Sequence, residues 1–114
     1  MLGIKKKKKL KNVSQLDLLK KYELSFKNQK ILFLYCKKKK IKFISTPFDT
    51  VSVKFLKNKI NLFKVSSTDL GNLPLLNQIG RLKKKVLLST GMSNLSEITK
   101  SIYELVKAGT NKKN

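Results

Sequence analysis

Apolar residues along this chain follow two different spacings. Three short runs, at residues 41–45, 61–66 and 85–89, are rich in β-branched, leucine and aromatic side chains, which is typical of strands. Around them, from residue 14 onward, apolar residues recur three or four positions apart, the spacing of amphipathic helices. The pattern predicts a short helix near residues 16–19 and then the order helix, strand, helix, strand, helix, strand, helix.

Local signals mark the ends of these helices. Small polar residues stand where helices are expected to begin, and cations or glycine stand where they are expected to end. These signals are Ser25 as an N-cap, lysines 37–40 in a last turn, Asp49 or Thr50 as an N-cap, a capping box of Asn94 with Glu97, and Gly109 after the last helix. Each helix therefore has a local reason to start or stop where the apolar pattern does.

The order of elements predicts an α/β fold with a parallel sheet. The strands start near residues 41, 61 and 85, and strands that alternate with helices in this way are joined by helical crossovers. Two architectures fit: a small doubly wound sheet, or a partial TIM (βα) barrel with about three parallel strands. A whole barrel needs about 250 residues. If the barrel interpretation holds, this chain carries only part of one.

The 114 residues are enough for one domain with a modest core. Residues 1–13 are a basic run without periodicity, and we expect them to be disordered. Residues 14–110 form the predicted folded unit. Residues 111–114 are expected to be a short tail.

Composition excludes several classes of protein. The longest apolar run, residues 31–36, is far shorter than the roughly 20 residues that span a bilayer, and no apolar stretch follows the basic start as it would in a secretory signal. The single cysteine, Cys36, cannot form an internal disulfide, which suits the reducing cytoplasm. With no histidine in the chain, histidine-based triads and histidine zinc sites are excluded.

A formal net charge of +21 raises the alternative of a lysine-rich protein that binds nucleic acid. All but one of the 27 basic residues are lysines, the exception being Arg81, whereas base and phosphate recognition favours arginine. The lysines are also spread over the whole chain. An A- and T-rich genome would enrich Lys, Asn and Ile together without selecting for a partner. Nonspecific binding to polyanions, with steep salt dependence, is expected under either interpretation.

Candidate chemistry lies where the predicted strands end. Hydroxyl residues follow all three, at 45–46, 66–69 and 89–90, and parallel strands bring such ends to one rim. Hydroxyls, backbone N–H groups and helix N-termini at one rim favour an anionic ligand. Lys64 shares a strand face with Ser66 and could reach that ligand. Taken singly, these hydroxyls are also ordinary N-caps, and Lys64 could be a solvated lysine.

Several stretches of the chain resemble N-acetylneuraminate (sialic acid) synthases, a family that includes legionaminic, pseudaminic and spore-coat polysaccharide synthases. The similarity covers roughly residues 12–110, in the family's order and spacing. The similar stretches are 14–26 (SQLDLLKKYELSF), 43–49 (FISTPFD), 63–70 (FKVSSTDL), 72–76 (NLPLL) and 86–93 (VLLSTGMS). The resemblance favours the barrel over the doubly wound sheet.

The resemblance implies a carbon–carbon bond-forming transferase. Enzymes of this family condense phosphoenolpyruvate with an N-acetylated amino sugar, such as N-acetylmannosamine, to a nonulosonic acid, and they use a divalent metal, manganese or magnesium. By position, Thr46, Lys64, Ser67 and Ser89 correspond to residues that bind phosphoenolpyruvate. Asp69 corresponds to an acidic residue that faces the reacting centre and the sugar, so Asp69 and Lys64 are the candidate catalytic residues. An ammonium group at that site would neutralise charge on the leaving phosphate.

The chain also departs from the family pattern. Thr68 stands where the family has glycine, which makes the backbone of this loop an open question. The first two strands, the later strands with the metal-binding histidines and the C-terminal antifreeze-like domain have no counterpart here. We therefore expect no metal ligands in this chain and no activity from it alone, while the complete enzymes of the family are expected to be cytoplasmic homodimers.

Overall fold

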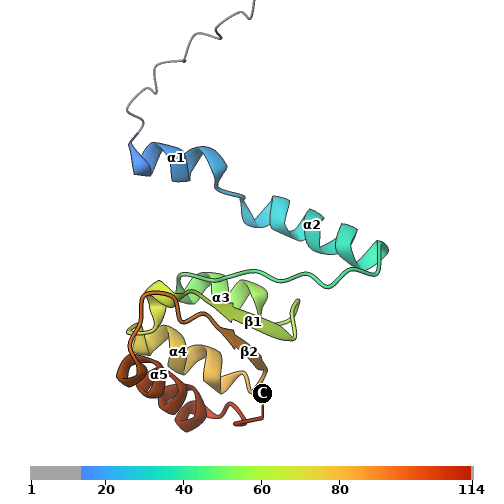
Figure 1. Ribbon diagram of the computed structural model, residues 1–114. Helices are drawn as coiled ribbons and strands as arrows, with labels where there is room; N and C mark the ends of the chain where they lie inside the picture. Colours follow the sequence, from blue (N-terminus) through green and yellow to red (C-terminus); the bar gives the residue numbers. More distant parts are fainter. Residues whose placement is uncertain (1–13, 114) are drawn as a thin grey trace, which may run out of the picture.

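The computed structural model describes residues 14–113, so the predicted basic segment 1–13 lies outside the described residues (Figure 1). Helices and strands alternate from the middle of the chain onward, and two further helices precede them. The elements are α1 (Gln15–Tyr22), α2 (Phe26–Lys38), α3 (Thr50–Leu56), β1 (Leu62–Val65), the 3₁₀ helix η1 (Ser67–Asp69), α4 (Leu73–Arg81), β2 (Lys85–Leu88) and α5 (Leu95–Ala108). No described helix is both long and apolar enough to cross a membrane.

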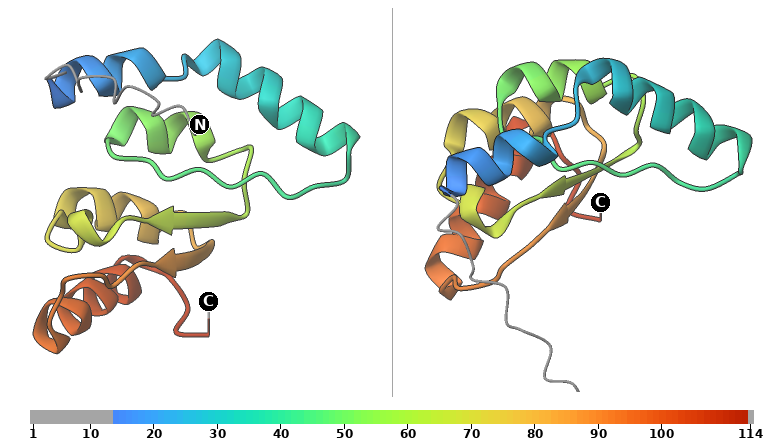
Figure 2. Two further views of the ribbon diagram at one scale, coloured as in Figure 1. Left: turned by 45° about the horizontal axis from the view of Figure 1, so that its top comes forward. Right: turned by 90° about the horizontal axis from the view of Figure 1, so that it is seen from above.

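The sheet in the described part of the chain has two parallel strands. Leu62 lies opposite Lys85, and the register continues to Val65 opposite Leu88. Phe63 and Val65 are fully buried, whereas Leu62 and Lys64 are half-buried. Because successive side chains of a strand point to opposite faces, β1 has one face in the core and one open face. The view from above in Figure 2 shows α3, α4 and α5 on one side of the strands.

The core lies between β1 and these three helices. Its buried side chains lie between positions 53 and 105 of the sequence. Five partly buried side chains pack against it: Phe43, Phe55, Leu82, Val86 and Leu88. The buried apolar side chains of this cluster are Val53, Leu56, Ile60, Phe63, Val65, Leu75, Leu76, Ile79 and Leu105. By contrast, neither α1 nor α2 buries a residue. The folded unit is therefore a layer of helices on one face of a small parallel sheet.

The α/β fold class with parallel strands is confirmed, but the strand expected at residues 41–45 is not formed, so the described sheet has two strands rather than about three. That segment has no place in the two-stranded sheet, and Figure 1 shows it as an irregular trace between α2 and α3. It passes beside the start of β1, where residues 42–44 and 59–62 together line a cavity of about 380 Å³. Phe43 packs against the core and Pro47, which has no N–H to donate, is buried. The side chains anchor this segment without a ladder of backbone hydrogen bonds.

The predicted N-caps and the end of α5 are confirmed, whereas α2 ends at Lys38, so that of lysines 37–40 only Lys37 and Lys38 lie in its last turn. Ser25 accepts a hydrogen bond from the Asn28 N–H, and Asp49, rather than Thr50, caps α3 by accepting from the Ser52 N–H. The capping box also forms: the Asn94 N–H donates to the Glu97 carboxylate and the Glu97 N–H donates to the Asn94 side chain, each over 3.0 Å. Gly109 follows α5 with φ 131°. Local capping chemistry thus positions the loops that follow each strand.

Candidate active site

The loops after β1 and β2 meet at the carboxyl ends of the strands. The Ser89 N–H donates to the Val65 carbonyl over 3.0 Å, which extends the ladder one residue beyond β2. Gly91 then lies against Ser67, because a Cβ at Gly91 would be 3.6 Å from the Ser67 Oγ. A side chain at Gly91 would thus fill the space beside this hydroxyl. Two of the three predicted hydroxyl clusters are therefore side by side.

The first of these loops is held by its own hydroxyl groups. Ser66 caps η1, and its Oγ lies 2.9 Å from the Thr68 Oγ1. Thr68 is in the 3₁₀ helix and is not one of the residues with positive φ, which in the described chain are Lys40, Lys83, Met92 and Gly109. The threonine in place of glycine therefore fits this backbone without the left-handed conformation that favours glycine.

Lys64 occupies the open face of the sheet near its carboxyl end. It is the third of the four residues of β1 and lies opposite Leu87 in the register. By strand alternation, Ser89 shares the face of Leu87 and therefore of Lys64. Lys64 is half-buried and Leu87 is 50% exposed. In a closed barrel this open face would be the interior, so Lys64 and Ser89 would both face inward.

Asp69 is the last residue of η1, and only one of its two carboxylate oxygens has a hydrogen-bond partner among the described residues. Its Oδ1 accepts a hydrogen bond from the Asn72 Nδ2 over 3.2 Å. Its Oδ2 is buried and has no hydrogen-bond partner among the described residues. A buried acceptor without a partner is costly and is uncommon outside functional sites.

A cavity of about 430 Å³ lies between the two loops and the start of α5. It includes Ser67 but not the other predicted site residues. Its lining residues are Ser67, Thr68, Leu70, Gly71, Leu73, Met92, Ser93, Glu97 and Lys100. The structure thus brings Ser67, Asp69 and Ser89 to one end of the sheet. The grouping of Thr46 and Lys64 with them in one concavity stays a prediction, since Thr46 lies half-buried in the irregular segment before α3.

Sequence reasoning missed two residues of this cavity, Ser93 and Lys100. Ser93 belongs to the loop after β2, and its Oγ donates to the Gly91 carbonyl over 3.2 Å. Lys100 lies three residues after Glu97, so both are on one face of α5 above the rim. The sequence could have indicated Lys100, because its spacing of three residues from Glu97 of the capping box puts it on the same helix face.

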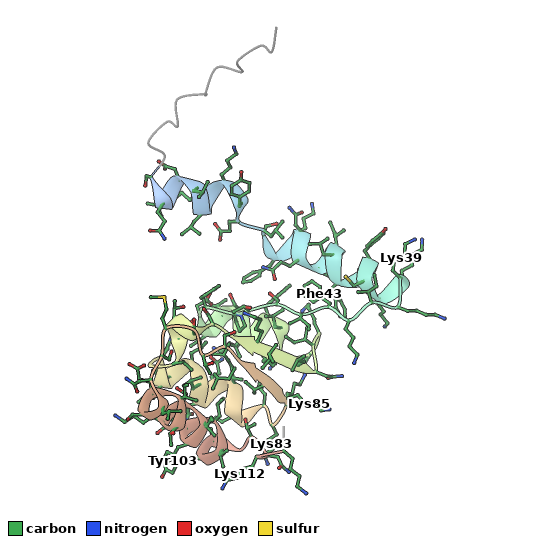
Figure 3. The ribbon with its side chains drawn as sticks, in the orientation of Figure 1. Lys39, Phe43, Lys83, Lys85, Tyr103 and Lys112 are labelled. Carbon is green, nitrogen blue, oxygen red and sulfur yellow. The ribbon has the colours of Figure 1, made fainter. Side chains whose placement is uncertain are left out.

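The lysine runs lie away from this rim. Lys37 and Lys38 are in the last turn of α2, and Lys85 begins β2 at the opposite end of the sheet, as the sequence predicted. The Lys84 ammonium donates hydrogen bonds to the carbonyls of Lys57 and Ile60, and its Nζ lies 2.6 Å from the Ile60 oxygen. These bonds hold the end of α3 against the sheet. Figure 3 shows Lys83 and Lys85 beside the beginning of β2 and Lys39 at the far end of α2.

The residues described here do not form a metal site. No three His, Cys, Asp or Glu side chains of residues 14–113 come together, and the whole chain has no histidine. The metal that the family resemblance implies does not fit the donors that residues 14–113 bring together.

A helix layer on a parallel sheet, with polar loops at the carboxyl ends of the strands, is an arrangement that (βα)-barrel enzymes have. The profile of the NeuB family matches residues 3–113, and the chain belongs to this family. This confirms the resemblance that the motifs carry.

Named relatives agree with this assignment. The N,N'-diacetyllegionaminic acid synthase of Campylobacter jejuni is 45% identical over 102 residues, which are 89% of this chain and 30% of that protein. The solved N-acetylneuraminic acid synthetase of Leptospira borgpetersenii, crystallised with citrate, has a TM-score of 0.78 at 30% identity over 83% of this chain and 34% of its own. The spore coat polysaccharide biosynthesis protein of Bacillus subtilis has a TM-score of 0.72 at 28% identity over 91% of this chain and 29% of its own. The chain spans about a third of the length of these relatives.

Proposed function

We propose that this chain supplies part of the catalytic barrel of a synthase that condenses phosphoenolpyruvate with an N-acetylated amino sugar to a nonulosonic acid. The observation that carries the proposal is the meeting of Ser67 with Gly91 at the carboxyl ends of two parallel strands, in a chain of the NeuB family. Barrel enzymes place their chemistry at this end. The names of the relatives support the product class.

Phosphoenolpyruvate carries a carboxylate and a phosphate, and the proposed site offers matching donors. The hydroxyls of Thr46, Ser67 and Ser89 would donate hydrogen bonds to these anions. The Lys64 ammonium, on the half-buried inner face of β1, would neutralise charge that develops on the departing phosphate. Water is less able to screen a charge there than at the exposed lysines, so the Lys64 ammonium would interact more strongly with an anionic ligand than an exposed lysine would.

Asp69 is proposed to face the sugar. Its buried Oδ2 has no partner among the described residues, and Asn72 orients the carboxylate through Oδ1. A sugar hydroxyl or acetamido N–H could donate to that oxygen. Asp69 would then hold the acceptor sugar next to the carbon of phosphoenolpyruvate that forms the new bond.

The rest of the machinery must come from residues outside this chain. Any manganese or magnesium in the complete enzyme would need ligands from other barrel strands, because the described residues bring no donor set together. We also propose that the complete enzyme is a cytoplasmic homodimer that acts on small molecules. The lone thiol of Cys36 agrees with a reducing compartment.

A chimera tests this proposal. In the Campylobacter jejuni synthase, the matching 102 residues would be replaced by the corresponding residues of this chain. Turnover is measured as phosphate release from phosphoenolpyruvate in the presence of that enzyme's own sugar substrate. We expect the chimera to turn over, and we expect the isolated 114-residue chain to show none. Turnover by the isolated chain would contradict the partial-barrel account, and an inactive but folded chimera would contradict the assigned function.

A further inference from the structure

A second cavity lies at the amino ends of the strands, at the opposite end of the sheet from the candidate active site. Its volume is about 380 Å³, a size typical of sites for small molecules. The residues that line it are Lys42, Phe43, Ile44, Lys59, Ile60, Asn61, Leu62 and Lys85. The irregular segment before α3, the turn into β1 and the start of β2 thus surround one hollow that the proposed reaction does not use.

The charged side chains of this lining all have the same sign. They are Lys42, Lys59 and Lys85, and no aspartate or glutamate lines the cavity. These three lysines come from separate parts of the sequence, so the fold, and not a run of lysines, brings them together. A cleft whose walls carry one sign of charge concentrates ions of the opposite sign. The cavity is therefore suited to an anion.

Hydrogen bonds fix two ammonium groups at this end of the sheet. The half-buried Lys59 donates to the Phe55 carbonyl over 2.7 Å, and its Nζ lies 3.9 Å from the centroid of the Phe55 ring. Lys84 donates to the carbonyl of Ile60, a lining residue, and offsets the negative charge of that oxygen. Lysines that are already positioned lose less side-chain freedom when a ligand binds.

Lys85 lies on the open face of the sheet, where it pairs in register with Leu62. By strand alternation Lys85 shares this face with Leu87 and therefore with Lys64. Lys64 lies two residues nearer to the carboxyl ends, about 7 Å along the strands, and it does not line the cavity. The cavity is therefore distinct from the proposed phosphoenolpyruvate site.

We propose that this cavity binds a phosphate group, carried either by inorganic phosphate or by a small phosphate ester. Phosphate matches the ammonium groups in charge, and its oxygens can accept hydrogen bonds from several of them together. The apolar side chains of Phe43, Ile44 and Leu62 complete the lining, as in other small-molecule sites. This site lies outside the residues of the proposed reaction, so its existence does not depend on the proposed function.

A titration followed by NMR tests the position of the anion. The isotope-labelled 114-residue chain is titrated with inorganic phosphate at constant ionic strength, with chloride as the balancing anion. We expect saturable shifts that are largest for the amides of Asn61 and Leu62. Shifts that do not saturate would overturn the proposal. So would shifts that are largest at Ser67 and Ser89, because they would place the anion at the carboxyl ends of the strands.

The same titration with glycerol phosphate distinguishes the two sources of the phosphate group. Tighter binding of glycerol phosphate at Asn61 and Leu62 would support the proposal and assign the site to a phosphate ester. Tighter binding of inorganic phosphate at these amides would support it and assign the site to the free ion.

Matched double variants separate the site from the net charge. Lys42→Gln with Lys85→Gln removes two lining ammonium groups and should weaken phosphate binding by about 10-fold or more, because charge-assisted hydrogen bonds are the stronger kind. Lys39→Gln with Lys83→Gln removes the same charge from positions outside the cavity, and it should change the affinity by less than about 2-fold. Figure 3 labels both control positions.

All four substituted lysines are exposed, so neither double variant should unfold the chain. Thermal denaturation of both variants checks that they keep the parent's stability. Equal losses of phosphate affinity in the two folded variants would overturn the proposal, because the overall charge of the chain would then account for the binding.

Discussion

Residues 50–110 and residues 15–38 are both largely helical, but only the first region has a core. Val53, Leu75 and Leu76 are each at most 1% exposed. In α1 and α2 no residue is buried, and Leu19 is 61% exposed. The N-terminal helices touch the rest of the chain at a few points, such as the stacked rings of Phe26 and Phe55, whose centroids are 4.5 Å apart.

The difference shows that local signals can form a helix without providing a surface for it to pack on. Ser14 and Ser25 cap α1 and α2 as Asn94 caps α5. What α5 has in addition is α4 packed against it. The leucines of the first region therefore stay exposed in the described chain, although the helices that carry them are formed.

The largest expected effect is a cavity in the core. Leu76→Ala should lower the free energy of unfolding by about 2 to 5 kcal/mol, because Leu76 is fully buried and its neighbours cannot close the space. Leu19→Ala in α1 should change it by less than about 0.5 kcal/mol. Urea denaturation of both variants measures the contrast. Similar losses would mean that α1 packs as tightly as α4, contrary to this description.

A smaller effect should come from the contact between α4 and α5. A Cβ at Gly80 would lie 2.6 Å from the Ala108 Cβ and 2.7 Å from the Leu105 carbonyl oxygen. Gly80→Ala should therefore destabilise the chain by about 1 to 3 kcal/mol through overpacking. Gly71→Ala is the control, since nothing lies within 4 Å of the Cβ it would add. If thermal denaturation shows Gly80→Ala to be neutral, the two helices are farther apart than described.

The smallest effect concerns the cap of α3, at the border between the two regions. The Ser52 N–H and the Ser52 hydroxyl each donate a hydrogen bond of 2.7 Å to the Asp49 carboxylate. These bonds, the backbone one most of all, lower the pKa of Asp49 from its ordinary value of 3.8. A lowered folded-state pKa gives stability that is present above the unfolded pKa and is lost as the pH falls through the folded value.

Asp49→Asn keeps an N-cap but removes this titration. Between about pH 5 and about pH 3, the chain with Asp49 should lose more stability than Asp49→Asn. Urea denaturation at the two pH values measures the difference. Identical losses in the two proteins would show that the carboxylate charge does not contribute to the cap.

Much of residues 50–110 was predictable, because its signals are local. The runs at 61–66 and 85–89 became β1 and β2, and the capping box and Gly109 bound α5 as expected. The run at 41–45 has equally strand-like residues and passes beside β1, but it does not pair with it, and pairing in register depends on the tertiary arrangement rather than on any single run of sequence. The close approach at Gly80 was invisible for the same reason, since it depends on where a second helix lies.

The candidate site was predictable in part. The parallel-sheet rule correctly placed Ser67 and Ser89 at one end of the strands, and the backbone accommodates Thr68 in a 3₁₀ helix. The unpaired oxygen of Asp69 could not be foreseen, because it depends on which way Asn72 turns the carboxylate. The position of Thr46 relative to the other residues depends on closure of the barrel, which needs more strands than the two that residues 14–113 form.

Lys64 is the one lysine among many for which a catalytic role is proposed. In the chimera with the Campylobacter jejuni synthase, Lys64→Ala should lower kcat/KM by about 100-fold or more, because the half-buried ammonium meets charge in the reacting complex. Lys38→Ala, at an exposed position in the last turn of α2, should change kcat/KM by less than about 2-fold. Equal losses of kcat/KM in the two variants would contradict a catalytic role for Lys64. They would show that bulk positive charge, and not a site at the carboxyl end of β1, accounts for the effect of Lys64 on activity.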